Sequence, residues 1–325
     1  MADVKEPIVI AHRGASGYVP EHTLIAKGIA HAMGADYIEQ DVVLSKDGVP
    51  VVLHDVQLDT VTDVAKVFSH RKRNDGRYYV IDFTVQELKS LNVYERFDHV
   101  TGRPIFPNRY PGGEGDFRIS TLAEEIRFIQ HLNRTTGRDV GIYPEIKRPA
   151  WHREQGVELT PVVLGVLAEY GYAERHDKCY VQCFDFAEVS NIRNRYGYKG
   201  RLIQLIDQGH DEESETNYDW LKSQEGLGEI AKMVEGIGPS LDDVLQASGD
   251  SREPKIAASG LTEAAHSFGL LVHPWTFRAD ALPSCVSSSD AFLDACFQIA
   301  KVDGLFADQP DTVVRYLRSQ TEKDL

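Results

Sequence analysis

Short apolar runs with strand character alternate with helix-like stretches along almost the whole chain. One of these runs, which ends at His54, pairs antiparallel with its neighbour in a hairpin and is not counted as a barrel strand. Eight runs remain: two begin at Ile8 and Tyr37, and the others are Val140–Ile146, Cys179–Phe184, Leu202–Ile206, Gly236–Gly238, Leu270–Trp275 and Gly304–Ala307. Helical patterns between them include Leu122–Leu132, Thr160–Tyr170, Ala187–Tyr196 and Leu261–Phe268. Alternating strands and helices favour a parallel sheet with helical crossovers. Because eight strands close a (β/α)8 barrel, the pattern predicts an α/β TIM barrel.

The strand left out of this count ends at His54 and pairs with the Tyr37 strand in an N-terminal hairpin around Asp47-Gly48. These two residues tolerate a positive φ and favour a two-residue turn between apolar runs. In such a turn, facing residues have numbers that add up to 95, so Asp41 would face His54. Facing residues in an antiparallel pair lie roughly 5 Å apart on one face of the sheet. Glu39 precedes Asp41 by two residues and would share that face.

Residues 57–119 interrupt the alternation, since they are rich in charged, aromatic and glycine residues. Within them, Thr84–Leu88 has the signature of a short capped helix. A barrel of about 250 residues plus an insertion of this size accounts for the 325 residues of the chain. We therefore predict one barrel domain over residues 1–325, with residues 57–119 as a small insertion subdomain over the catalytic face, after the hairpin.

The net charge of −15 restricts the partners that the chain can have. A surface of this sign repels nucleic acids and anionic membranes over long range, so we expect no nucleic acid partner. No apolar run approaches the roughly 18 residues of a membrane span. The N-terminal residues have no basic stretch followed by an apolar one, so no signal peptide is visible. We expect a soluble protein, periplasmic if a signal peptide has been removed and otherwise cytoplasmic.

Three carboxylates stand near the ends of apolar strands: Glu39, Asp41 and Glu145. Oxygen ligands without histidine or thiolate favour hard cations. We therefore predict one divalent cation, with Ca²⁺ as the first choice and Mg²⁺ as the second. A bound dication would also keep neighbouring carboxylates ionised. Ordinary salt bridges are the alternative for each carboxylate taken singly.

Two histidines and two cations accompany these carboxylates. His12 and His54 are candidates for an acid–base pair, because histidine titrates near neutral pH. Arg13 and Lys147 are candidates for phosphate contacts, since arginine binds phosphate oxygens bidentately and lysine adds a point charge. Lys147 could also balance a nearby carboxylate. Together these residue types predict metal-assisted cleavage of a phosphate ester.

Later strands end in residues that could line a pocket for the carbon part of a substrate. The candidates are Gln182, Phe184, Trp275 and Phe277. Trp275 is the strongest of the aromatic candidates because it stands at a strand end between Pro274 and Thr276. For the two phenylalanines, a position in the apolar core is an equally good interpretation.

Short motifs follow one another in order over nearly the whole chain: His12-Arg13-Gly14-Ala15-Ser16-Gly17, Pro20-Glu21-His22-Thr23, Glu39-Gln40-Asp41, Asp47-Gly48, His54-Asp55, Glu145-Ile146-Lys147, Trp275-Thr276 and Gly304-Leu305-Phe306-Ala307-Asp308-Gln309-Pro310. In these motifs the chain resembles the glycerophosphodiester phosphodiesterases, most closely their bacterial periplasmic, calcium-dependent branch. It departs from that family at His22, where many members have asparagine, and at Ala307, where threonine is common.

The resemblance implies a metal-dependent phosphoric diester hydrolase. The expected reaction converts small glycerophosphodiesters, such as glycerophosphocholine or glycerophosphoethanolamine, to an alcohol and sn-glycerol 3-phosphate. One route would pass through a cyclic phosphate formed by the glycerol 2-hydroxyl. By resemblance, His12 and His54 are the catalytic pair, and the ligand set and phosphate contacts are those given above.

Two other functions remain open at this point, and the oligomeric state could be monomer or dimer. A related phospholipase D acting on lysolipids or sphingomyelin would use the same histidines and metal ligands. The acidic surface and the insertion argue against it, because enzymes of lipid surfaces tend to expose apolar or basic faces. A non-catalytic phosphodiester-binding protein is the other alternative.

Overall fold

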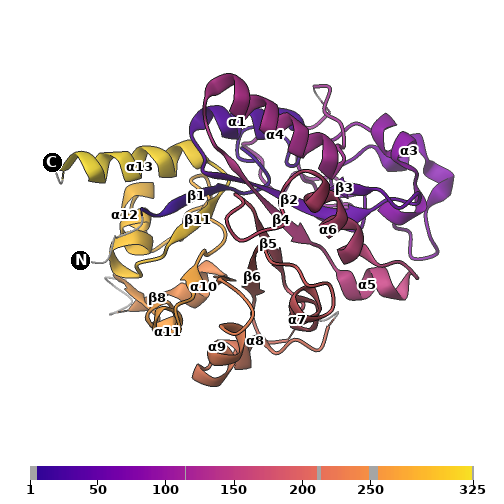
Figure 1. The fold of residues 1–325 in the computed structure, drawn as a ribbon. Helices are drawn as coiled ribbons and strands as arrows, with labels where there is room; N and C mark the ends of the chain where they lie inside the picture. The colour runs from indigo at the N-terminus through magenta and orange to yellow at the C-terminus, as the bar shows by residue number, and fades with distance from the viewer. Residues whose placement is uncertain (1–5, 114, 211–213, 249–254, 324–325) are drawn as a thin grey trace.

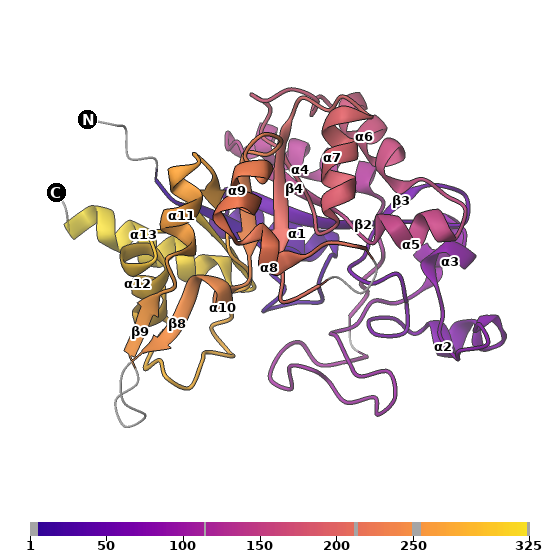
Figure 2. The same cartoon turned by 90° about the horizontal axis from the view of Figure 1, so that it is seen from below.

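The structure is a computed structural model of the chain and describes residues 6–113, 115–210, 214–248 and 255–323. Helices surround a curled central sheet in Figure 1, and Figure 2 shows the same fold from below. Residues 1–5, where the expectation about a signal peptide falls, lie outside the described part. Within the described part, no helix combines the length and the apolar character that crossing a membrane requires.

Eight parallel strands form the central barrel. They are β1 (Ile8–Ala11), β2 (Tyr37–Leu44), β4 (Gly141–Ile146), β5 (Tyr180–Cys183), β6 (Arg201–Ile206), β7 (Gly236–Pro239), β10 (Leu271–Val272) and β11 (Gly304–Ala307). Their spatial order is β10-β7-β6-β5-β4-β2-β1-β11, so neighbours in sequence are neighbours in space. All eight predicted strands are present, and the predicted barrel is confirmed.

The barrel closes between β10 and β11 through single hydrogen bonds rather than a regular ladder. The amide of Phe306 donates to the carbonyl of Pro274 over 3.0 Å, and the amide of Phe277 donates to the carbonyl of Phe306 over 2.8 Å. Regular pairing of β10 ends at Val272, earlier than the predicted end at Trp275. Pro274 has no amide hydrogen, which removes one donor from this part of the strand.

Helices cover the outside of the barrel. They are α1 (Leu24–Met33), α4 (Leu122–Thr136), α5 (Pro149–Glu154), α6 (Leu159–Glu169), α7 (Phe186–Asn194), α8 (Tyr218–Leu221), α9 (Gln224–Ile230), α10 (Leu241–Val244), α11 (Leu261–Ser267), α12 (Ser289–Asp294), the π-helix η3 (Ala295–Ile299) and α13 (Pro310–Lys323). Thr121 begins α4 with a capping box, and Gly137 ends it at a φ of +70°. A hairpin that the sequence did not predict, β8 (Leu245–Ser248) and β9 (Lys255–Ala258), projects beside α10 (Figure 2).

The register of the N-terminal hairpin differs from the prediction by one residue. Strand β3 (Pro50–Val52) pairs antiparallel with β2, and Val42 faces Val52 while Val43 faces Val51, so facing residue numbers add up to 94. The amide of Leu53 donates to the carbonyl of Asp41 over 2.9 Å. The predicted pairing of Asp41 with His54 is therefore wrong, and Leu53 is the residue next to Asp41.

The turn explains this shift. The amide of Ser45 donates to the carbonyl of Val49 over 3.1 Å, and the amide of Gly48 donates back to the carbonyl of Ser45 over 3.0 Å. Gly48 has a φ of +73°. These contacts are those of a three-residue loop, in which a tight turn is followed by a left-handed glycine. The third loop residue moves the register by one.

Residues 57–119 contain short helices joined by irregular segments: α2 (Val64–Val67), η1 (Ser69–Arg71), η2 (Val80–Asp82) and α3 (Val85–Ser90). The predicted capped helix at Thr84 is confirmed, because its side chain accepts from the amide of Glu87 in a capping box. The segment has a buried apolar cluster that includes Leu58, Val61, Val80, Phe83, Leu88, Leu91 and Val93. In Figure 2 it extends from the side of the barrel that carries β3.

Aromatic side chains fill the interior of the barrel. Tyr37, Tyr143 and Tyr180 are buried, and the rings of Tyr143 and Tyr180 stack at 5.1 Å between centroids. The hydroxyl of Tyr143 lies 2.9 Å from Nδ1 of His273. Each tyrosine precedes a polar residue by two positions on its strand, so the polar residues form the next layer toward the carboxyl ends. That polar layer is the base of the site described next.

Candidate active site

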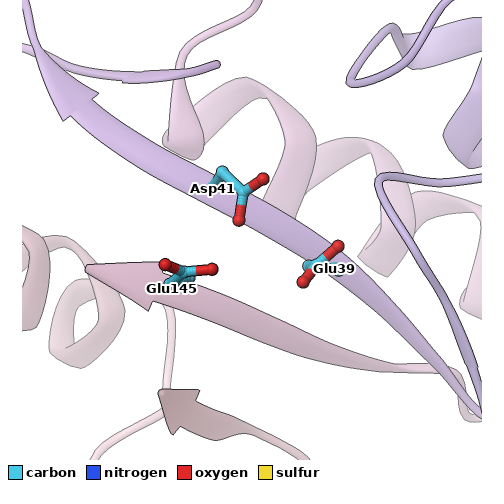
Figure 3. A group of neighbouring side chains, drawn as sticks. All are labelled: Glu39, Asp41 and Glu145. Atoms are coloured by element: carbon cyan, nitrogen blue, oxygen red, sulfur yellow. The ribbon is translucent and has the colours of Figure 1, made fainter. Parts of the chain in front are cut away.

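The three predicted carboxylates meet beside the carboxyl end of β4, at the part of β2 that precedes the hairpin. Asp41 pairs in register with Glu145 across the two strands, and Glu39 lies two residues before Asp41. One oxygen from each of the three lies within 4.8 Å of the others, and all three side chains are buried (Figure 3). The sheet register thus brings together carboxylates from strands that are more than 100 residues apart in sequence.

The electrostatics of this cluster favour a cation. Burial and the charge of Asp41 raise the pKa of Glu39 well above its usual range, and burial raises the pKa of Glu145 to about 8. Burial would also raise the pKa of Asp41, but His22 and Lys147 outweigh it and hold that pKa well below its usual range. The Oδ1 atom of Asp41 is buried and has no hydrogen-bond partner in the described part of the chain. Buried, acceptor-only oxygens in excess fit a divalent metal ion.

His12 follows β1 and is oriented by Asp308. Its Nδ1 lies 2.6 Å from Oδ1 of Asp308, and its Nε2 lies 3.8 Å from Oε2 of Glu39. A carboxylate on Nδ1 fixes the proton there, so the lone pair of Nε2 points to the carboxylate cluster. Burial and the charge of Arg13 lower the pKa of His12 to about 4.

His54 follows β3 by two residues and is oriented by its neighbour Asp55. Its Nδ1 lies 2.5 Å from Oδ1 of Asp55. Burial and the charges of Arg13 and Lys147 lower the pKa of His54 to about 3. Although the predicted register is wrong, His54 and Asp41 line the same pocket. The chain leaves the regular strand after Val52, and this departure brings His54 to the site.

The two predicted cations lie against the carboxylates. The backbone amide of Arg13, at a φ of +57°, donates to Oε2 of Glu39 over 2.8 Å. Its guanidinium donates to both oxygens of Glu21 over 3.1 and 3.0 Å, and its Nε lies 3.6 Å from Asp41. Lys147 follows β4, and its ammonium lies 2.8 Å from Oε1 of Glu145.

These groups line a pocket of about 440 Å³ at the carboxyl ends of the strands. Of the predicted site residues, all but Phe277 line it. Phe277 is fully buried, and its ring stacks on Phe292 at 6.1 Å between centroids. The core interpretation therefore applies to Phe277. Residues at the pocket that the sequence reasoning did not assign are Asp55, Gln57, Arg148, Leu205, Asp207, Thr276, Arg278 and Phe306.

One wall of the pocket is aromatic. The rings of Phe184 and Trp275 meet edge to face at 5.8 Å, and the indole of Trp275 donates to the carbonyl of Gly238 over 2.9 Å. Asp207, directly after β6, lines the pocket with them. Gln182 is buried deeper, and its amide donates to Oε1 of Glu39 over 3.0 Å.

Behind the site, Lys27 and Asp308 were missed as functional residues. His22 and the fully buried Lys27 stand in line behind Asp41, and Lys27 also lies 3.3 Å from Glu125. Asp308 follows β11 directly, so the strand-end rule that found Asp41 would also have found it. Lys27 gave no such signal, because it lies in an amphipathic helix where lysine is ordinarily exposed.

Comparison with known proteins decides the family. A model of the glycerophosphoryl diester phosphodiesterase family matches residues 12–312, nearly the whole described barrel. The chain belongs to this family. A glycerophosphodiester phosphodiesterase of Haemophilus influenzae is 41% identical over 96% of this chain and 90% of its own length. One of Treponema pallidum is 37% identical over 96% of this chain and 92% of its own length.

Solved structures of glycerophosphodiester phosphodiesterases share the fold. An Oleispira antarctica phosphodiesterase, solved in complex with the product sn-glycerol-3-phosphate, aligns with a TM-score of 0.63 at 18% identity, over 96% of this chain and 97% of that one. A glycerophosphodiester phosphodiesterase of Agrobacterium tumefaciens aligns with a TM-score of 0.60 at 19% identity, over 95% and 99%. The barrel is thus the fold of this enzyme family.

Proposed function

We propose that this phosphodiesterase hydrolyses small glycerophosphodiesters to an alcohol and sn-glycerol 3-phosphate. The observation that carries the proposal is the pair of carboxylate-oriented histidines, His12 and His54, in one pocket with three clustered carboxylates. In the reaction, the bond from phosphorus to the head-group oxygen breaks and a new bond to an attacking oxygen forms. One proton leaves the attacking hydroxyl and one reaches the departing alcohol.

Glu39, Asp41 and Glu145 would hold one divalent cation, with Ca²⁺ as our first choice and Mg²⁺ as the second. All three offer only oxygen, which suits these ions better than zinc. When bound, the ion would neutralise charge on the phosphoryl oxygens. Gln182 donates to Glu39 and keeps one of its oxygens oriented.

His12 and His54 would divide the proton transfers. Their low pKa values make both rings neutral at pH 7 before substrate binds, which suits the histidine that accepts the proton. An anionic phosphate in the pocket raises the pKa of a nearby imidazole, which suits the histidine that donates. Arg13 and Lys147 would contact the phosphate oxygens and stabilise the charge that develops on them.

The aromatic wall would receive the head group. A quaternary ammonium or ammonium ion binds to the faces of aromatic rings, and a carboxylate nearby adds attraction. Phe184, Trp275 and Asp207 provide this combination on one side of the pocket. We therefore assign choline and ethanolamine esters as the preferred substrates.

We further propose that residues 1–325 form one barrel domain, with residues 57–119 as an insertion subdomain beside the catalytic face. Its apolar cluster is distinct from the barrel core and includes Ala26 of α1 and Val43 and Val51 of the hairpin, which supports a small subdomain packed on this side of the barrel. Ion pairs from this segment to residues at the strand ends support its place beside the site.

A substrate panel tests the proposal. Glycerophosphocholine, glycerophosphoethanolamine and lysophosphatidylcholine are supplied to the EDTA-treated protein, which is then given CaCl₂ or MgCl₂. We expect release of sn-glycerol 3-phosphate from the two glycerophosphodiesters only after metal is restored. His54→Ala should lose at least about 100-fold in kcat while its melting temperature stays close to that of the parent.

The same panel separates the alternatives. A preference for lysophosphatidylcholine would replace the proposal by a phospholipase D. If no diester released glycerol phosphate under any condition, a phosphodiester-binding protein would be favoured instead. Full activity in EDTA would contradict the proposed metal.

A further inference from the structure

The two carboxylates that orient the histidines share a second feature. Each uses one oxygen for a histidine and the other for an arginine of residues 57–119. Asp55 holds His54 through Oδ1, and its Oδ2 accepts from Nη1 of Arg96 over 2.6 Å. Asp308 holds His12 through Oδ1, and its Oδ2 accepts from Nη2 of Arg109 over 2.7 Å.

Arg96 reaches a third group of the site. Its Nη2 and Nε donate to the two oxygens of Glu21 over 2.6 and 3.1 Å, and Glu21 in turn accepts from the guanidinium of Arg13. The charges of Arg13 and Arg96 hold the pKa of Glu21 well below its usual range, although burial alone would raise it. Arg96 therefore stands one carboxylate away from both His54 and Arg13.

Arg109 is fixed on several sides. Its guanidinium donates to both oxygens of Asp280 over 2.8 and 3.0 Å and lies 3.6 Å from the centroid of Phe106. Its side chain is only 4% exposed. Asp308 also accepts from Arg278 over 3.0 Å, so Arg109 is one of two arginines on this carboxylate.

Both arginines and both histidines line a second cavity of about 300 Å³, next to the main pocket. Phe106 and Ile105 of the insertion line it as well. Breaking one partner of a buried, hydrogen-bonded ion pair leaves the other charge uncompensated. The segment that carries Arg96 and Arg109 therefore contributes to the orientation of Asp55 and Asp308.

We propose that Arg96 and Arg109 are positioning residues, through which the insertion sets the orientation of His54 and His12. The inference rests on the proposed function, because it assigns the histidines to proton transfer. An arginine on one carboxylate oxygen prevents rotation of the carboxylate and keeps the other oxygen on Nδ1. A small misplacement of a reacting group can cost about 100-fold in rate. The insertion thus supplies a contact that helps to align each histidine, and at Asp308 it acts together with Arg278 and Ser16.

The two arginines should differ in their kinetic effect. Arg109 acts on His12 alone, so Arg109→Gln should lower kcat by about 10- to 100-fold and leave KM within about threefold. Arg96 also holds Glu21 and, through it, Arg13, so Arg96→Gln should lower kcat and raise KM together. Arg109→Lys should recover part of kcat, since lysine keeps the charge but not the fork of donors.

A double-mutant cycle with Asp308→Ala tests whether Arg109 acts through Asp308. Once Asp308 is absent, Arg109→Gln should lower kcat by less than about twofold. Arg103→Gln is the matched control, because Arg103 is exposed on the same segment and the substitution removes the same charge. It should leave kcat and KM unchanged. Equal kcat losses from Arg109→Gln with and without Asp308 would overturn the proposal, as would unchanged kcat in Arg109→Gln.

A readout that needs no turnover keeps this test separate from that of the function. In protein labelled with ¹⁵N-histidine, the Nδ1 protons of His12 and His54 should give downfield resonances, since both are held by carboxylates. Arg109→Gln should broaden or lose the His12 resonance and keep that of His54, and Arg96→Gln should do the reverse. If the parent were inactive but the resonances responded in this way, the proposed function would fail and the positioning role would stand. Unchanged resonances in both variants would refute that role.

Discussion

The Nε2 atom of His22 lies 2.7 Å from Oδ2 of Asp41, and both side chains are buried. On the other side of the ring, Nδ1 lies 3.1 Å from the ammonium of Lys27. An ammonium can only donate, so Nδ1 accepts and Nε2 carries the proton that is donated to Asp41. His22 is therefore neutral, in accord with burial and Lys27 lowering its pKa to about 3. This contact fixes Asp41 with its Oδ1 unpaired in the carboxylate cluster.

Removing His22 should weaken the proposed metal site. Loss of a hydrogen-bond partner behind a metal ligand typically costs about 10- to 100-fold in affinity, and we expect this loss for His22→Ala. His22→Asn should lose less, because its amide can still donate. Calorimetric titration of the EDTA-treated variants with CaCl₂ measures both effects, with His131→Ala, at an exposed position of α4, as the control. A dissociation constant for His22→Ala equal to that of the parent would contradict the positioning of Asp41 by this contact.

Glu145→Gln should separate metal binding from folding. Burial and Asp41 raise the pKa of this carboxyl, whereas its ion pair with Lys147 opposes the shift. Lys147 keeps the charge of Asp41 nearby in the variant, so the stability of the EDTA-treated variant should stay close to that of the EDTA-treated parent. CaCl₂ should raise the melting temperature of the parent through binding to the folded state, and should do so much less in the variant. Thermal unfolding with EDTA and with CaCl₂ gives all four values. Equal calcium shifts in the two proteins would remove Glu145 from the proposed ligand set.

Asp207→Asn should change the choice of head group. The amide has no net charge, so attraction to a cationic head group falls while the shape of the pocket is kept. We expect kcat/KM for glycerophosphocholine to fall by about 1.5- to 5-fold, an amount typical of one partly exposed charge pair. For the uncharged head group of glycerophosphoglycerol, kcat/KM should stay the same. An equal fall in kcat/KM for both substrates would mean that Asp207 does not select substrates by the charge of the head group.

Glu95 makes stability depend on pH in a predictable direction. Burial raises the pKa of this carboxyl to about 7, although Arg109 opposes the shift. Between about pH 4.5 and 7, the folded chain keeps a proton that the unfolded chain has released, so this residue reduces stability as the pH rises. Glu95→Gln should therefore stabilise the protein at pH 8 by roughly 1 to 3 kcal/mol and have little effect at pH 4.5. Urea unfolding at the two pH values measures the difference, and an equal gain at both would refute this origin.

The barrel and much of the site could be predicted from the sequence because both follow from local patterns of residues. Apolar runs marked all eight strands, and strand ends marked Glu39, Asp41 and Glu145. Glycine in the hairpin could not decide the register, since Gly48 with a positive φ serves turns of two or three residues equally. Trp275, the stronger aromatic candidate, lines the pocket, but the sequence could not decide between the pocket and the core for Phe184 and Phe277, of which only Phe184 lines the pocket.

The contacts of the insertion's arginines with the site could not be predicted from local patterns. Arg96 and Arg109 are in segments without periodicity, and their carboxylate partners Asp55 and Asp308 lie 41 and 199 residues away. Nothing local distinguishes them from exposed arginines such as Arg103. Only the three-dimensional packing of the insertion against the strand ends brings these pairs together.

The hairpin loop sets which face of β3 meets which apolar core. Val51 packs in the cluster that includes the insertion, and Val52 packs in the core of the barrel. Because side chains alternate along a strand, sliding β3 by one residue against β2 would exchange these two environments. The pairing of Val42 with Val52 therefore holds the barrel core and the insertion cluster in one arrangement.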